Sequence, residues 1–156
     1  MRESAVILLA EDNEDDILLI RHASKKAGIL NPLFVVRDGE AAIDYLRGTG
    51  KFASRAEYPL PSLLLLDLNM PGKDGYEVLE WIRSQPELRS LRVVALTIES
   101  DRDAVNRAYQ LGANSFVVKS TDFKATIESF RLLKDYWIGT DKCPDVTRPP
   151  AEQPTH

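Results

Sequence analysis

The chain has 156 residues, of which 44% are hydrophobic and 28% charged, and its formal net charge is −4. This length and composition are typical of one globular domain that buries about two thirds of its unfolded surface. The acidic balance argues against nucleic acid or an anionic membrane as the main partner. No apolar run approaches the roughly 18 residues of a membrane span. The one cysteine, Cys143, excludes an intrachain disulfide and favours a reducing cytoplasm.

Five apolar runs alternate with five helical patterns, which predicts a doubly wound α/β fold with a parallel sheet. Expected strands are Ala5–Ala10, Leu33–Val36, Leu63–Asp67, Val93–Leu96 and Ser115–Val118. Expected helices cover about Glu14–Ala27, Glu40–Leu46, Tyr76–Ser84, a segment between Ser100 and Gly112, and Asp122–Ile138.

Two segments lie outside this pattern. The connection from Gly48 to Pro61 is long and rich in glycine, proline and charge, so we expect a surface loop. We assign residues 1–138 to the folded domain. Residues 139–156 are rich in proline and nearly free of apolar side chains, which predicts a tail that is disordered or loosely packed.

Charged side chains follow three of the expected strands. Glu11 and Asp12 come after the first, Asp67 ends the third, and Lys119 follows the fifth. Ligands of parallel sheets sit outside the carboxyl ends of the strands, where the strand order reverses. The three carboxylates should therefore meet at one edge, where their mutual repulsion calls for a divalent cation or a shared proton.

The loop after the first strand is acidic, which disfavours direct binding of a nucleotide phosphate. Glu14, Asp15 and Asp16 in this loop are explained by the helix dipole, but Glu11 and Asp12 are not.

Asp67 closes four leucines and is costly to desolvate without partners. The structural alternative to a binding role is that Asp67 acts as a capping residue. A hard cation such as Mg2+, held by carboxylates, a carbonyl and waters, would resolve the crowding. Lys119 would balance an anion held at Asp67, and Thr97 at the end of the fourth strand would supply a hydroxyl donor.

Taken together, these residues resemble the motif set of response-regulator receiver domains over about residues 5–138. The motif residues are Glu11-Asp12, Asp67, Met70-Pro71, Asp74-Gly75, Thr97 and Lys119. The resemblance implies a five-stranded parallel sheet in the flavodoxin-like order 2-1-3-4-5.

The resemblance also implies a role for each matching residue. Asp67 would be the phosphoacceptor, and Lys119 the lysine that binds the phosphoryl group. Mg2+ would be held by Glu11, Asp12, Asp67 and the backbone carbonyl of Asn69. Thr97 and Phe116 match the two switch positions of the family.

Two positions depart from the family pattern. Ser120 replaces the proline that usually follows the lysine, often after a cis bond, so the backbone near Lys119 is expected to differ. A cis bond before a residue other than proline costs about 2.5–4 kcal/mol. Ile98 replaces a small residue after Thr97, and its bulk would narrow access to Asp67. Neither change removes a reacting group.

A finer resemblance is to single-domain regulators paired with phytochrome-type histidine kinases. It rests on the loop of Gly48 to Pro61 and on the segment from Lys134-Asp135-Tyr136-Trp137 to Cys143-Pro144. The alternative is that long loops and terminal aromatic residues arise in many receivers.

We therefore expect a stand-alone, cytoplasmic phosphorylation switch that signals through protein contacts, not an enzyme beyond its own dephosphorylation. Two alternatives remain open. One is a receiver-like scaffold that acts without phosphorylation, as Ser120 and Ile98 would allow. The other is a Mg2+-dependent phosphatase of the haloacid-dehalogenase type, although Asn69 stands where that class needs a second catalytic aspartate.

Two further expectations concern regulation. Asn69 and Glu99 should flank the phosphoryl group and tune dephosphorylation. A symmetric dimer should form through the fourth helix, fifth strand and fifth helix and be tightened by phosphorylation, with Tyr136, Trp137 and Ile138 extending its apolar surface. The alternative is that Trp137 folds back onto the domain's own surface. The apolar stripe of Phe123, Ile127, Phe130 and Leu133 should be buried by the sheet.

Overall fold

The computed structural model describes residues 5–98 and 102–138. The strands are β1 Ile7–Ala10, β2 Leu33–Val36, β3 Leu63–Asp67, β4 Arg92–Thr97 and β5 Ser115–Val118. The helices are α1 Glu14–Lys26, α2 Gly39–Arg47, α3 Gly75–Ser84, α4 Arg102–Gln110 and α5 Phe123–Leu133. Short 3-10 turns, η1 Gly50–Phe52 and η2 Pro86–Leu88, and one π-helical turn, η3 Lys134–Ile138, complete the described elements.

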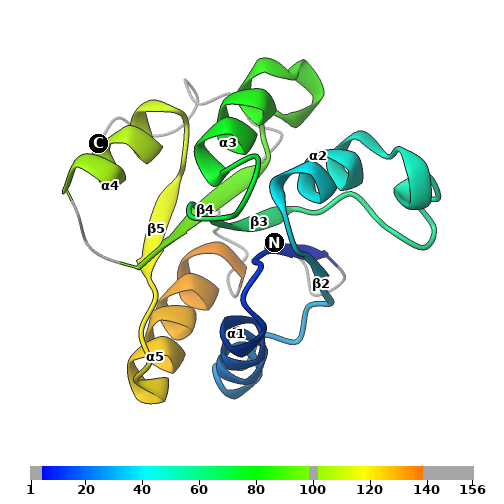
Figure 1. Ribbon diagram of the computed structural model, residues 1–156. Coiled ribbons are helices and arrows are strands. Elements are labelled where there is room, and N and C mark those ends of the chain that lie inside the picture. Colours follow the sequence, from blue (N-terminus) through cyan, green and yellow to red (C-terminus); the bar gives the residue numbers. More distant parts are fainter. Residues whose placement is uncertain (1–4, 99–101, 139–156) are drawn as a thin grey trace.

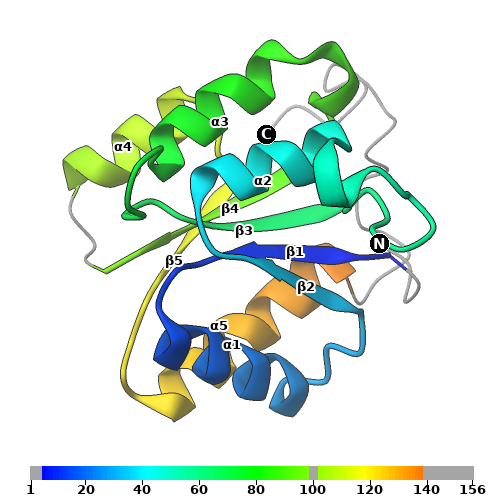
Figure 2. The ribbon, with the colours of Figure 1, turned by 45° about the vertical axis from the view of Figure 1, so that its right-hand side comes forward.

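The five strands form one parallel sheet in the order β2-β1-β3-β4-β5, which confirms the predicted topology. Helices α1 and α5 cover one face, and α2, α3 and α4 cover the other (Figures 1 and 2). Alternate residues of the central strands feed two cores. Leu64 and Leu66 pack towards α2 and α3, whereas Leu63 and Leu65 pack towards α1 and α5. Burial on both faces explains why these strands are continuous apolar runs.

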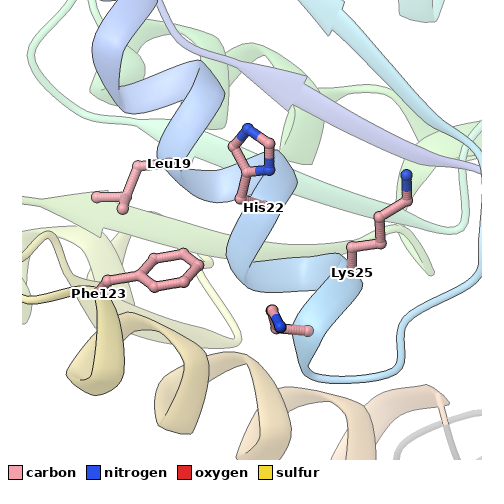
Figure 3. A pocket seen from close by; sticks show the side chains of 5 residues that line it. Leu19, His22, Lys25 and Phe123 are labelled. Atoms are coloured by element: carbon pink, nitrogen blue, oxygen red, sulfur yellow. The ribbon is translucent and has the colours of Figure 1, made fainter.

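Most expected element bounds agree with the structure to within one or two residues. Two differences have a clear physical origin. The last helix was expected to run to Ile138, but its α-helical part ends at Leu133 and a π-helical turn follows. Phe123 was expected to be buried, yet it is 36% exposed because it is the first residue of α5, beyond the sheet. It lines a groove with Leu19, His22 and Lys25 of α1 (Figure 3).

The connection after α2 lies mostly at the surface, as expected, but aromatic side chains attach it to the domain. Phe52 is buried, and its ring packs against Tyr45 of α2 and against Tyr58. The Tyr45 hydroxyl donates to the Pro59 carbonyl at 2.8 Å. The Arg55 guanidinium donates to the Tyr45 and Leu46 carbonyls in the last turn of α2, and the Tyr45 carbonyl also accepts from the Gly48 N–H. Aromatic packing therefore folds this segment onto α2.

Helix α4 is lightly packed, since Ala108 is its buried residue. Its C-terminal end is held by Arg83 of α3, whose Nε and Nη2 atoms donate to the Gly112 carbonyl at 3.0 and 2.8 Å. The same guanidinium donates to the Leu91 carbonyl before β4 at 3.0 Å. The Arg107 guanidinium lies 4.0 Å from the centre of the Tyr76 ring. Both contacts tie α4 to α3 through the C-terminal half of α4.

Candidate functional site

The acidic side chains predicted at strand ends meet at the carboxyl edge of the sheet. Glu11 follows β1 and is fully buried, while Asp67 ends β3 and is 1% exposed. Asp12 is exposed beside them. Carboxylate oxygens of the three residues lie within 4.8 Å of one another. They meet because β1 and β3 are hydrogen-bonded neighbours, with Ala10 opposite Leu66.

The Lys119 amine lies among these carboxylates. Its Nζ atom is 2.7 Å from Glu11 Oε1, 3.0 Å from Asp16 Oδ2 and 3.3 Å from Asp67 Oδ2. Backbone pairing positions Lys119 at this edge of the sheet. The Lys119 N–H donates to the Thr97 carbonyl at 2.6 Å, which extends the pairing of β5 with β4. The side chain is 14% exposed, so the amine contacts the carboxylates at low solvent exposure.

The crowding shifts the protonation of the buried groups. The pKa of Glu11 is raised from 4.5 to about 7, first by burial and then by a hydrogen bond with Asp67, although Lys119 acts in the opposite direction. Burial alone would lower the pKa of Lys119, but its carboxylate contacts outweigh burial and raise that pKa. The site is thus short of positive charge, as expected where a proton or a cation is to be held.

The donor set fits a hard divalent cation. Glu11, Asp12 and Asp67 offer only carboxylate oxygens, the ligands that Mg2+ prefers. Glu11 Oε1 is buried and accepts no hydrogen bond of acceptable geometry from the described residues, although the Lys119 amine is close. The Asn69 N–H donates to Asp67 Oδ1 at 3.0 Å, which turns the chain after β3 back towards this carboxylate. Asn69 therefore lies beside Asp67, at the edge of the acidic cluster.

The two expected switch residues lie on β4 and β5. Thr97 is the last residue of β4 and is 4% exposed, one position beyond Leu96, which pairs with Asp67. Phe116 is half-buried on β5, and its ring packs edge-on against Tyr109 of α4, with 6.1 Å between the ring centres. Phe116 thus connects β5 to the lightly packed helix α4.

The departures from the family pattern have modest structural effects. The described residues contain no cis peptide bond, so the bond between Lys119 and Ser120 is trans. The Ser120 hydroxyl accepts from the Asp122 N–H at 3.0 Å, just before α5. Ile98 is 60% exposed, so its side chain extends towards solvent instead of packing in the core. Glu99, expected to tune dephosphorylation, lies outside the described residues.

The motif pair Asp74-Gly75 is structural in this protein. The Asp74 side chain caps α3 by accepting from the Glu77 N–H at 3.0 Å. A Cβ atom on Gly75 would lie 2.5 Å from the Asp67 carbonyl oxygen, so only glycine allows α3 to begin so close to the end of β3.

Asp16 is a site residue that the sequence did not reveal. We attributed it to the helix dipole, yet its carboxylate reaches Lys119. The sequence offered no periodic signal for this contact, because Asp12 precedes the N-cap of α1 whereas Asp16 lies in its first turn.

The fold and the site define a phosphorylation-switch domain, and comparisons with known proteins identify its family. Residues 7–131 match the response regulator receiver domain. The chain is 37% identical over 142 residues to a probable methanogenesis regulatory protein, FilR2, of Methanothrix harundinacea, covering 89% of this chain and 87% of FilR2. It is also 37% identical over 139 residues to the response regulator Rcp1 of Synechocystis, covering 89% of this chain and 92% of Rcp1.

Solved structures agree with the sequence comparisons. The phosphorylated cyanobacterial phytochrome response regulator RcpA superposes with a TM-score of 0.81 at 35% identity, over 91% of this chain and 99% of RcpA. The Mn2+-bound form of Rcp1 superposes with a TM-score of 0.78 at 36% identity, over 90% of this chain and 99% of Rcp1.

The chain therefore belongs to the response-regulator receiver family, as its motifs predicted. Members of this family are signalling switches that pair with histidine kinases and bind a divalent cation at an acidic cluster like the one formed here. Among the described residues, none of the helices has the length and apolar character needed to span a membrane.

Proposed function

We propose that this receiver accepts a phosphoryl group on Asp67 from the phosphohistidine of a histidine kinase. The supporting observation is that Asp67, 1% exposed at the end of β3, lies beside the Lys119 amine and two further carboxylates. In the transfer, an oxygen of Asp67 forms a bond to phosphorus while the phosphorus–nitrogen bond breaks. The electron pair stays on the imidazole nitrogen, and the product is an acyl phosphate.

Mg2+ is the proposed cofactor, held by Glu11, Asp12, Asp67 and the Asn69 carbonyl. When bound, it neutralises charge on the phosphoryl group. The chain's own residues do the rest. Lys119 pairs with the phosphoryl oxygens in place of its contact with Asp67, and the Thr97 hydroxyl donates to the same group. Glu11 keeps the amine at the carboxyl edge through its 2.7 Å contact.

The proposed output is a change in the surface formed by α4, β5 and α5. Phe116 connects this surface to the site, since it lies on β5 three residues before Lys119 and packs on Tyr109 of α4. The surface exposes apolar side chains from all three elements: Tyr109 at 44%, Val118 at 37%, Leu132 at 63% and, in the following turn, Tyr136 at 62%. Such a surface suits a symmetric homodimer that phosphorylation tightens. The Trp137 side chain, expected to contribute, lies outside what the structure describes.

We further propose a phytochrome-type kinase as the phosphoryl donor and the cytoplasm as the location. Similarity to RcpA, described as a cyanobacterial phytochrome response regulator, and to RPA3017, described as acting in red light signalling, supports the kinase assignment. FilR2 is equally similar to this chain and is described as a methanogenesis regulator. Direct phosphotransfer from a candidate kinase is therefore the test of the partner.

Asn69 and Glu99 are proposed to set the lifetime of the acyl phosphate. Hydrolysis needs a water in line with the departing carboxylate, and a polar side chain can orient that water. Asn69 supports the assignment by its position, since its N–H bonds directly to Asp67. Replacing both residues with apolar ones should slow dephosphorylation, and equal decay in the wild type and the double variant would contradict the proposal.

Incubation with acetyl phosphate and Mg2+, followed by intact-mass measurement, tests the central proposal. A labile adduct of one phosphoryl group is expected in the wild type and should be absent in Asp67→Asn, which keeps the size of the side chain. Wild-type protein without an adduct would support a scaffold instead, and rapid turnover of the donor would support a phosphatase. Circular dichroism of Asp67→Asn controls for folding.

A further inference from the structure

The Lys119 amine contacts a third carboxylate, which comes from α1 and not from a strand end. Asp16 Oδ2 accepts a hydrogen bond from Nζ at 3.0 Å, shorter than the 3.3 Å between Nζ and Asp67 Oδ2. The contact joins two residues separated by 103 positions in the sequence. The Asp16 side chain is 34% exposed, so its carboxylate contacts the amine from a more solvent-accessible position than the buried Glu11 does.

Asp16 is itself held in place by residues that follow β1. Its N–H donates to Asn13 Oδ1 at 2.9 Å, the capping bond of α1. The Asn13 N–H in turn donates to Glu11 Oε2 at 3.2 Å. Because Glu11 Oε1 contacts the Lys119 amine, these contacts close a ring through Glu11, Asn13, Asp16 and Lys119. The ring connects the end of β1, the start of α1 and the end of β5.

The other acids in the first turn of α1 do not share this position. Glu14 pairs with Arg37 beside β2, and both side chains are more than half exposed. Asp15 is exposed on the surface of α1. An attraction to the helix dipole is common to all three acids, so it does not explain why Asp16 is directed at Lys119.

An ammonium group has three hydrogens to donate. Asp16 accepts one of them, and carboxylate oxygens of Glu11 and Asp67 lie 2.7 and 3.3 Å from the same nitrogen. A lysine side chain has four rotatable bonds and loses much rotamer freedom when it is fixed. Holding the amine before the reaction removes that cost from the phosphoryl transfer, since the amine is already at the place where the phosphoryl oxygens arrive.

We propose that Asp16 is a positioning residue, which holds the Lys119 amine towards Asp67 for phosphoryl transfer. The inference rests on the proposed function of Asp67 as phosphoacceptor. Asp16 acts through Lys119 and does not touch the reacting atoms. Removing it should slow phosphorylation without removing the nucleophile.

The kinetic test compares Asp16→Ala with Asp15→Ala, which removes the same charge from the same helical turn. With acetyl phosphate at saturating Mg2+, Asp16→Ala should lower the rate constant of phosphorylation about tenfold, within the coupling range of contacting residues. The rate constant of Asp15→Ala should equal that of the wild type. Asp16→Asn keeps an acceptor oxygen without the charge, so it should recover part of the rate.

A double-variant cycle separates positioning from a general structural role. If Asp16 acts through the amine, Asp16→Ala should have no further effect on the rate in a Lys119→Ala background. An equal fold-decrease in both backgrounds, or faster phosphorylation of Asp16→Ala than of the wild type, would overturn the proposal.

Urea unfolding without Mg2+ provides a readout independent of phosphorylation. Asp16→Ala should lower the unfolding midpoint in the wild-type background, where it removes an ion pair. It should raise the midpoint in the Lys119→Ala background, where an unpaired Asp16 would repel Glu11 and Asp67. Equal shifts in both backgrounds would refute the contact. If the wild type forms no adduct at all, the proposed function fails, and this cycle still decides whether Asp16 positions Lys119.

Discussion

Gly75 lies against the backbone of the proposed phosphoacceptor, Asp67. A Cβ atom on residue 75 would lie 2.5 Å from the Asp67 carbonyl oxygen, which is too close for a normal contact. Because both partners in this contact are backbone, neither can move aside without shifting α3 or the end of β3. We predict that Gly75→Ala destabilises the protein by about 1–3 kcal/mol, the usual cost of overpacking. Urea unfolding measures this, and Glu80→Ala on the exposed side of α3 serves as a control. Equal stability of the two variants would contradict the close approach.

The acidic cluster predicts which substitution weakens metal binding. Asp12→Ala should lower Mg2+ affinity about tenfold or more, since a hard cation loses a charged oxygen ligand. Calorimetric titration of the unphosphorylated protein measures the affinity. Asp15→Ala has the same change in net charge but lies outside the cluster, and it should bind Mg2+ nearly as well as the wild type. Equal losses in both variants would indicate a general charge effect.

The raised pKa of Glu11 predicts how stability depends on pH in metal-free protein. Between its ordinary value of 4.5 and about 7, the folded protein binds a proton that the unfolded chain does not. The stability that Glu11 contributes is therefore complete below pH 4.5 and is lost as the pH rises towards 7. Glu11→Gln cannot titrate, so the difference in unfolding free energy between wild type and variant should change across this window. A constant difference would refute the shift.

The apolar surface on α4, β5 and α5 predicts the site of self-association. Leu132→Lys should weaken a phosphorylated dimer, because it places a charge on the apolar surface of the proposed interface. Leu30→Lys is the matched control. Leu30 is 75% exposed but precedes β2, at the opposite edge of the sheet from β5. Sedimentation velocity of phosphorylated and unmodified protein measures the effect, and a monomer in both wild-type states would exclude this interface.

The sequence predicted the sheet and the strand-end residues well, because both follow from short-range patterns. Runs such as Leu63–Asp67 are buried on both faces and read as strands without ambiguity. A parallel sheet then brings Asp67 and Lys119 to one edge whatever the details of packing.

Contacts between side chains on separate elements could not be predicted in the same way. Asp16 and Lys119 are too far apart in sequence for any periodic pattern to connect them. Phe52 and Tyr58 looked like loop residues because the glycines and prolines around them dominate local propensity. The burial of Phe52 and the packing of Tyr58 depend on a complementary surface, the Tyr45 side of α2, which exists only in the folded chain.

The contact with Arg83 anchors α4 at its C-terminal end only, among the contacts described above. The guanidinium fixes the turn at Gly112 to α3, and Arg107 adds a second contact in the same half of the helix. The opposite end, at Arg102, follows the segment that leaves Thr97. If the proposed output displaces this end, α4 would pivot about Gly112, and Arg102 would move further than Gln110.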